Sequence, residues 1–107
     1  MRLYVPATLD RLAAYAEAGE VRDHEEPFVA DDEDEESEYA ALMAAADAAV
    51  ELQPAGGRRV VLVVEVDREG DPVPMRRVVA VHADPEGAGP DDDLAWFATQ
   101  EIPALLA

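Results

Sequence analysis

The sequence contains no cysteine and no lysine. Without cysteine, the chain has neither a disulfide framework nor a thiolate that could act as nucleophile or metal ligand. All eight strong cations are arginines, against 25 acidic residues, and the formal charge is −17. Because such a surface repels nucleic acid and anionic membranes, we expect no direct binding to either.

Long apolar runs are also missing. No stretch approaches the ~18 apolar residues that a membrane helix needs. The N-terminal stretch carries Arg2, Pro6 and Asp10 where a signal peptide would be continuously apolar. We therefore expect a cytoplasmic protein.

The residue sets of common enzymes are incomplete. The only serine, Ser37, precedes a helical pattern and suits an N-cap. His82 ends a strand pattern near Asp84 and could act as a general base, but no nucleophile accompanies it. Gly56 and Gly57 precede a strand and lack the lysine and helix of a phosphate-binding loop. The sequence thus predicts no catalytic residue, no metal site and no cofactor.

The negative charge is concentrated in one segment. Residues 20–38 hold eleven acids and one arginine, a net of −10, and the rest of the chain accounts for −7. Blocks of like charge are normally hydrated and mobile. With a length suited to one modest core, we expect a single domain over residues 1–107 with an acidic, mobile connecting segment at 20–37.

The first half of the chain predicts one strand and two helices. Residues 1–6 alternate in polarity, and Pro6 is expected to end this strand. Thr8 and Gly19 suit the N-cap and the C-terminal stop of a first helix. A second helix is expected to start at Ser37 and to bury one stripe, which comprises Tyr39, Leu42, Met43, Ala46, Ala49, Val50 and Gln53.

The second half predicts a hairpin and a tail of uncertain type. Residues 54–57 fit a turn, and 58–66 form a nearly continuous valine run, typical of a strand buried on both faces. Residues 73–83 are expected to return beside it as an antiparallel partner. Residues 91–102 fit either a helix, which Pro103 would keep from continuing, or a strand.

The order of these elements predicts an α+β fold. A crossover through helices would place the first two strands parallel to each other, with the hairpin strand added alongside. We expect a small mixed sheet of three to four strands with two to three helices packed mainly on one face.

Dispersed blocks of the sequence resemble a known family. The chain opens with MRLYVPATL, contains EYAAL and RRVVLVVEV, and closes with LAWFATQEIPALL. The Arg-x-Tyr-Val-Pro start and the Trp-Phe-Ala-Thr-Gln-Glu-Ile-Pro tail resemble a family of small uncharacterised actinobacterial proteins, a domain of unknown function. The resemblance implies no activity, so function has to be argued from the residues.

Polar and aromatic side chains within these blocks could converge at the sheet edge. The candidate ligand-binding residues are Arg2, Tyr4, Glu38, Tyr39, Gln100 and Glu101. Together they would form a small-molecule or enzymatic site. The alternative is that such groups cap the C-terminal tail and hydrogen-bond it to the sheet.

The acidic run at 31–36 is a candidate partner-binding segment, which consists of Asp31, Asp32, Glu33, Asp34, Glu35 and Glu36. It lacks the glycine turn and spaced ligands of a calcium site. Its charges recur at nearly the spacing of phosphates along a nucleic-acid strand. The arginine pairs at 58–59 and 76–77 could bind an anion, a partner's carboxylate or this acidic segment.

Complete fold signals without a catalytic set favour a non-enzymatic module that binds a protein partner, itself possibly basic, through the acidic segment and an exposed sheet edge. One alternative is a small enzyme or small-molecule-binding domain near Tyr4, Glu38, Gln100 and Glu101. A second is a nucleic-acid mimic that binds a basic partner. Self-association through the hairpin edge is a further option.

Overall fold

The computed structural model describes residues 1–53, 56–89 and 91–107. Its elements are β1 (Arg2–Ala7), α1 (Leu9–Ala18), α2 (Glu35–Glu51), β2 (Val60–Glu65), the 3-10 turn η1 (Met75–Arg77), β3 (Val78–Ala83), β4 (Ala95–Ala98), the 3-10 turn η2 (Thr99–Glu101) and α3 (Ile102–Leu106). The first half of the turn predicted at 54–57 lies outside the described residues. No helix in the described ranges has the length and apolarity to cross a membrane.

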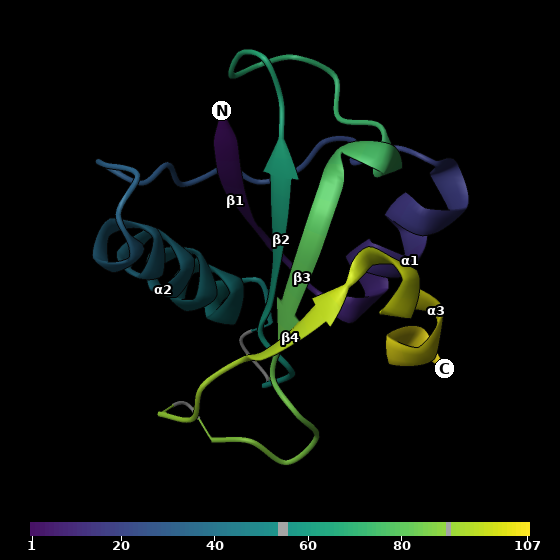
Figure 1. Cartoon of the computed structure of the whole chain (residues 1–107). Helices are drawn as coiled ribbons and strands as arrows, with labels where there is room; N and C mark the ends of the chain where they lie inside the picture. Colours follow the sequence, from purple (N-terminus) through teal and green to yellow (C-terminus); the bar gives the residue numbers. More distant parts are fainter. Residues whose placement is uncertain (54–55, 90) are drawn as a thin grey trace.

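The four strands form one sheet in the order β1-β2-β3-β4 (Figure 1). Helices and a sheet in one unit confirm the α+β class, but every neighbouring pair is antiparallel, so the expected mixed sheet is wrong. Between β1 and β2 the chain runs the length of the sheet twice. It runs back along β1, where Phe28 bridges to Tyr4, and α2 then returns it to the end where β1 stopped.

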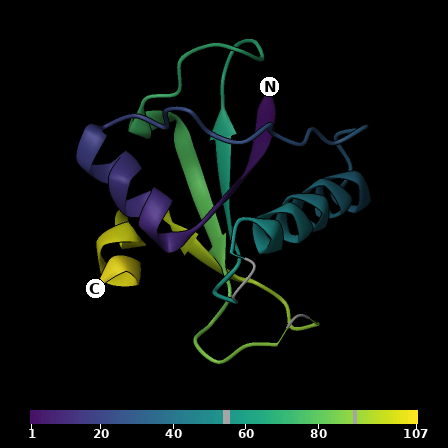
Figure 2. The same ribbon diagram turned by 180° about the vertical axis from the view of Figure 1, so that it is seen from behind.

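The helices cover both faces of the sheet, as Figures 1 and 2 show from opposite sides. On one face, α1 and α3 contribute Leu12, Tyr15, Ile102 and Leu105 to a core with Leu3, Val5, Val60, Leu62 and Val64. On the other face, alanines of α2 pack against Tyr4, Val61 and Val63. The expectation of helices mainly on one face is therefore wrong, because β2 buries alternate valines on each side.

Helix α2 packs on the sheet mainly through alanines, with Leu42 and Met43 partly buried beside them. Ala41, Ala45 and Ala49 are buried, whereas Tyr39 and Val50 are 54% and 49% exposed. The predicted stripe is therefore wrong at Tyr39 and Val50. Small side chains let the helix approach the sheet closely, and close packing of many atoms supplies the contact energy. Tyr39 and Val50 are left on the exposed flanks of the helix.

The predicted caps of α1 are confirmed. Thr8 accepts a hydrogen bond from the Arg11 N–H at 3.0 Å, and Gly19 ends the helix in a left-handed conformation. Helix α2 starts earlier than predicted, because Asp34 is its N-cap and accepts from the Ser37 N–H at 2.7 Å. Hydrogen bonding from Ser37 holds the pKa of Asp34 below its ordinary value.

The tail contains both a strand and a helix. Edge strand β4 occupies Ala95–Ala98, and α3 begins at Ile102. Pro103 lies in the first turn of α3, where its missing N–H is not needed, so it starts a helix and does not stop one.

Pro6 does not end the first strand as predicted but lies inside β1. Because β1 is an edge strand, it tolerates a missing N–H donor on its outer side.

Candidate functional site

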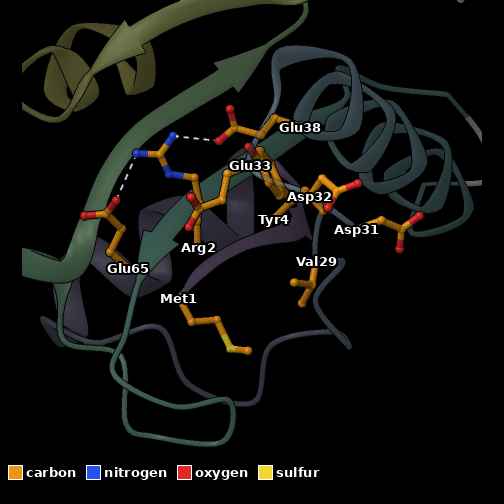
Figure 3. Close-up of a pocket in the computed structure, with 10 residues that line it drawn as sticks. Met1, Arg2, Tyr4, Val29, Asp31, Asp32, Glu33, Glu38 and Glu65 are labelled. Atoms are coloured by element: carbon orange, nitrogen blue, oxygen red, sulfur yellow. Dashed lines mark hydrogen bonds and ion pairs between the residues drawn. The ribbon is translucent and has the colours of Figure 1, made fainter.

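A groove of about 480 Å³ opens along the outer edge of β1 (Figure 3). We call it the acidic groove, because five carboxylates line it: Asp31, Asp32, Glu33, Glu38 and Glu65. Met1 and Val29 also line it and are 55% and 42% exposed. The groove therefore offers apolar surface as well as negative charge.

The sheet edge builds one wall of this groove. The Tyr4 N–H donates to the Phe28 carbonyl at 2.9 Å, and the Phe28 N–H donates to the Tyr4 carbonyl at 2.8 Å. Residues 29–33 then form the wall opposite Met1 and Arg2. Because peptide groups alternate in direction along an antiparallel strand, those of Arg2 point to the same side as those of Tyr4. The backbone of Arg2 thus faces the groove.

Arg2 is the one arginine among the residues that line the acidic groove. Its two terminal nitrogens donate to Glu38 at 3.1 Å and to Glu65 at 2.9 Å. The hydrogen bond to Glu65 raises the pKa of the Arg2 guanidinium, although partial burial opposes this. The Arg2 side chain is 45% exposed, so these pairs contribute at most about 1 kcal/mol to stability.

Tyr4 also lines the acidic groove, and its hydroxyl lies near Arg2 and Glu38. Burial raises the pKa of Tyr4, and the negative charge of Glu38 raises it further, while Arg2 opposes both effects. The hydroxyl therefore keeps its proton at neutral pH and can donate a hydrogen bond.

A second groove of about 250 Å³ lies on the α2 side of the sheet and shares Arg2, Tyr4 and Glu38 with the acidic groove. We call it the aromatic groove, and its other lining residues are Glu35, Tyr39, Leu42 and His82. Burial lowers the pKa of His82, so its ring is neutral at pH 7. His82 is the cross-strand partner of Trp96, which is 60% exposed. Trp96 therefore lies next to the aromatic groove.

The predicted ligand-binding residues come together only in part. The grooves gather four of them, Arg2, Tyr4, Glu38 and Tyr39. Gln100 and Glu101 follow β4, which lies three strands from β1, or roughly 14 Å at the usual spacing. Glu101 accepts from the Ala98 N–H at 2.9 Å, and Thr99 donates to the Val78 carbonyl at 2.7 Å. Thr99 and Glu101 thus fix the tail to the sheet.

The acidic run divides among several positions. Its six acids are all exposed, as the sequence predicts for hydrated carboxylates. Asp31, Asp32 and Glu33 line the acidic groove, Glu35 lines the aromatic groove, and Asp34 caps α2. Within the described ranges, no three carboxylate or histidine side chains are grouped closely enough to hold a metal ion.

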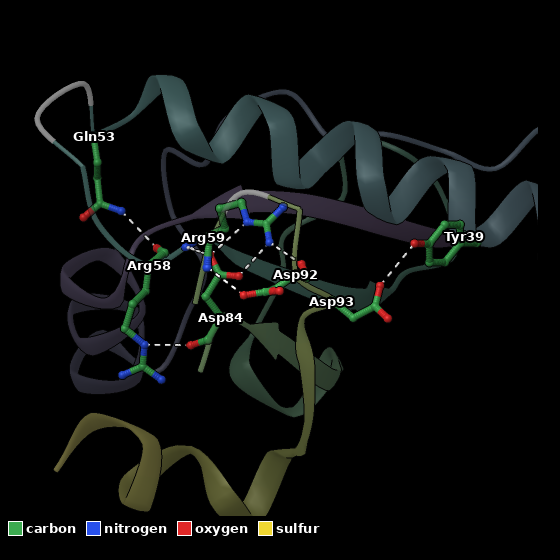
Figure 4. Close-up of polar contacts among 8 residues, drawn as sticks. Tyr39, Gln53, Arg58, Arg59, Asp84, Asp92 and Asp93 are labelled. Carbon is green, nitrogen blue, oxygen red and sulfur yellow. Dashed lines mark hydrogen bonds and ion pairs between the residues drawn. The ribbon is translucent and has the colours of Figure 1, made fainter. Parts of the chain in front are cut away.

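One polar cluster was not predicted from the sequence (Figure 4). Arg59 donates through two nitrogens to the Asp84 carboxylate, at 2.8 and 2.7 Å, and their side chains are 4% and 7% exposed. Arg59 also donates to the Asp92 carbonyl at 2.6 Å, and Arg58 donates to the Asp84 carbonyl at 2.7 Å. Burial alone would raise the pKa of Asp84, but hydrogen bonds from Arg59 outweigh it and hold the pKa below its ordinary value.

The register of the hairpin is the signal that could have revealed this cluster. Val60 pairs with Ala83, which places Arg59 directly opposite Asp84. Arg59 binds Asp84 and not the acidic segment, which was one possible partner of the hairpin arginines. Glu38 in α2 pairs instead with Arg2. The Arg59–Asp84 pair is buried and holds the backbone of Asp92 ahead of β4, so we assign it a structural role.

One protein-family model matches almost the whole chain. The model described as "Family of unknown function (DUF6912)" matches residues 1–106. The chain belongs to this family. The resemblance to a domain of unknown function is thereby confirmed, and the DUF6912 match includes both grooves and the Arg59–Asp84 cluster. Searches of curated proteins and of solved structures gave no match.

Proposed function

We propose that this DUF6912 chain is a non-enzymatic interaction module that binds a basic segment of a partner protein in the acidic groove. The observation that carries the proposal is the lining of that groove, which holds five carboxylates and a single arginine beside exposed Met1 and Val29. Complementary charge accelerates encounter and selects the partner. Burial of the two apolar side chains adds affinity.

The edge of β1 supports an extended conformation for the bound segment. The peptide groups of Arg2 point toward the groove, and an extended peptide can pair with such groups by adding a strand to the sheet. The opposite edge suits this role less well. Strand β4 has four residues, and the Glu101 carboxylate already accepts from the outward N–H of Ala98.

Affinity capture from cell lysate tests the proposal. The wild type is compared with a groove variant in which three exposed acids are neutralised, D31N/D32N/E33Q. The matched control removes the same charge from exposed acids outside the groove, as D10N/E17Q/E51Q. Each captured protein is then purified and titrated with all three forms.

We expect the wild type and the control to capture a protein at low salt and to release it at high salt. The groove variant should bind that protein at least tenfold more weakly. Equal binding by all three forms would refute the groove as the site. Displacement of the captured protein by duplex DNA would instead favour the nucleic-acid mimic. The cytoplasmic location and the actinobacterial origin stay predictions of the sequence.

A further inference from the structure

Helix α2 covers only part of its face of the sheet. It packs mainly on β1 and β2, while β3 and β4 carry the cross-strand neighbours His82 and Trp96 on that side. Trp96 is 60% exposed, and Tyr39, on the flank of α2, is 54% exposed. Within the described residues, two large aromatic rings therefore stay in solvent on either side of His82. Exposed apolar surface of this kind commonly marks a binding site.

Carboxylates from two elements flank these rings. Glu35 and Glu38 come from the first turn of α2 and line the aromatic groove. Asp93 comes from the segment before β4 and accepts a hydrogen bond from the Tyr39 hydroxyl at 3.4 Å (Figure 4). A ligand on this surface would meet aromatic faces and negative charge together. A second copy of this chain would bring like charges into contact, so it is a poor occupant.

The two grooves adjoin each other. They share Arg2, Tyr4 and Glu38 as lining residues, so the aromatic groove lies beside the acidic groove at the β1 edge. Arg2 itself places a guanidinium between two carboxylates at this junction (Figure 3). A guanidinium can stack on an aromatic face while its N–H groups bind carboxylates, whereas the compact ammonium of lysine makes such a contact less well.

We propose that the partner segment carries an arginine whose guanidinium stacks on Trp96 and Tyr39 while it donates hydrogen bonds to Asp93. This inference rests on the proposed function and adds the residue type that the site selects. Strands β1 and β4 lie three spacings apart, roughly 14 Å, so a segment that pairs with Arg2 and then turns across the sheet needs at least about four extended residues to reach Trp96. The arginine therefore lies at least about four residues from the basic residue in the acidic groove.

Two synthetic peptides of equal charge test this inference. Each has about ten residues, roughly 33 Å when extended, and one alternates arginine with serine, the other lysine with serine. Trp96 is the only tryptophan of the chain, so its fluorescence reports on this surface alone. We expect both peptides to bind, the arginine peptide about 3–10-fold more tightly, and only the arginine peptide to change the Trp96 emission.

Variants locate the preference. In calorimetric titrations, Trp96→Leu and Tyr39→Leu should each bind the two peptides equally, with the affinity that the wild type has for the lysine peptide. Val50→Ala, which alters an exposed apolar residue elsewhere on α2, should keep the preference. Equal affinity of the two peptides for wild type, with unchanged Trp96 emission, would overturn this inference and leave the proposed function standing. If neither peptide binds, the proposed function fails, and this inference fails with it.

Discussion

Arg59 and Asp84 face each other across the ends of β2 and β3 and form a two-point ion pair that is almost completely buried. The Arg59 N–H also donates to this carboxylate at 2.8 Å, and the Asp84 N–H donates to the Arg59 carbonyl at 2.9 Å. The pair therefore closes the hairpin and, through the Asp92 carbonyl, holds the loop that leads to β4.

Asp84→Asn should strongly destabilise the fold. The substitution leaves the Arg59 charge buried without its counter-ion, which costs about 3–5 kcal/mol of the free energy of unfolding. Urea denaturation followed by circular dichroism measures this loss. Glu86→Gln, an exposed acid in the same loop, serves as the control and should change stability by less than about 0.5 kcal/mol.

A second variant separates charge from packing. The double replacement Arg59→Met with Asp84→Leu removes both charges, and buried ion pairs are often replaced by apolar residues without loss. We expect it to recover most of the stability that Asp84→Asn loses. A double variant as unstable as Asp84→Asn would show that the hydrogen bonds, and not the unpaired charge, carry the effect.

The Asp84 contribution should disappear in acid. The pKa of Asp84 in the folded chain lies below its ordinary value because hydrogen bonds from Arg59 outweigh burial. Its stabilisation is thus fully present above the unfolded pKa of about 3.9 and is lost as pH falls through the lower folded value. The free energies of unfolding of wild type and Asp84→Asn should differ by a constant amount above about pH 3.9. As pH falls further, the two values should converge. A difference that stays constant throughout the acid range would contradict the assignment.

His82 should make stability depend on pH nearer neutrality. Burial lowers its folded pKa, so the unfolded chain binds the proton first as pH falls below about 6.5. The free energy of unfolding should therefore be constant above about pH 6.5. It should decrease as pH falls from there to the folded pKa of His82. In urea titrations between pH 8 and pH 5, His82→Gln should lack this decrease, whereas His24→Gln should retain it. The same pH slope in both variants would assign the decrease to another group.

The Thr8 cap should be worth a measurable part of the stability. Its hydroxyl accepts from the Arg11 N–H at the buried start of α1. Thr8→Ala should cost about 0.5–2 kcal/mol, measured as a lower urea midpoint. Thr8→Ser keeps the hydroxyl and should lose much less. Equal losses in the two variants would show that the methyl group of Thr8, and not the hydrogen bond, stabilises this end.

The valine run of β2 shows how a correct local prediction can accompany a wrong arrangement. The run predicts burial on both faces, and the strand is buried on both. That same observation already requires something to cover each face, whereas the order of elements predicts helices mainly on one face. The predicted parallel direction of β1 and β2 is wrong, because the residues between them run the length of the sheet twice before β2 begins.

The sequence by itself determined what depends on neighbouring residues: the Thr8 and Gly19 caps, the α+β class and the exposure of the acids at 31–36. These features follow from local hydrogen bonding and hydration. Only the tertiary structure decided that Arg59 meets Asp84, and that Arg2, Tyr4 and Glu38 share two grooves while Gln100 and Glu101 lie at the other sheet edge. Those contacts join residues far apart in the chain, so they depend on strand order and register, which no single segment encodes.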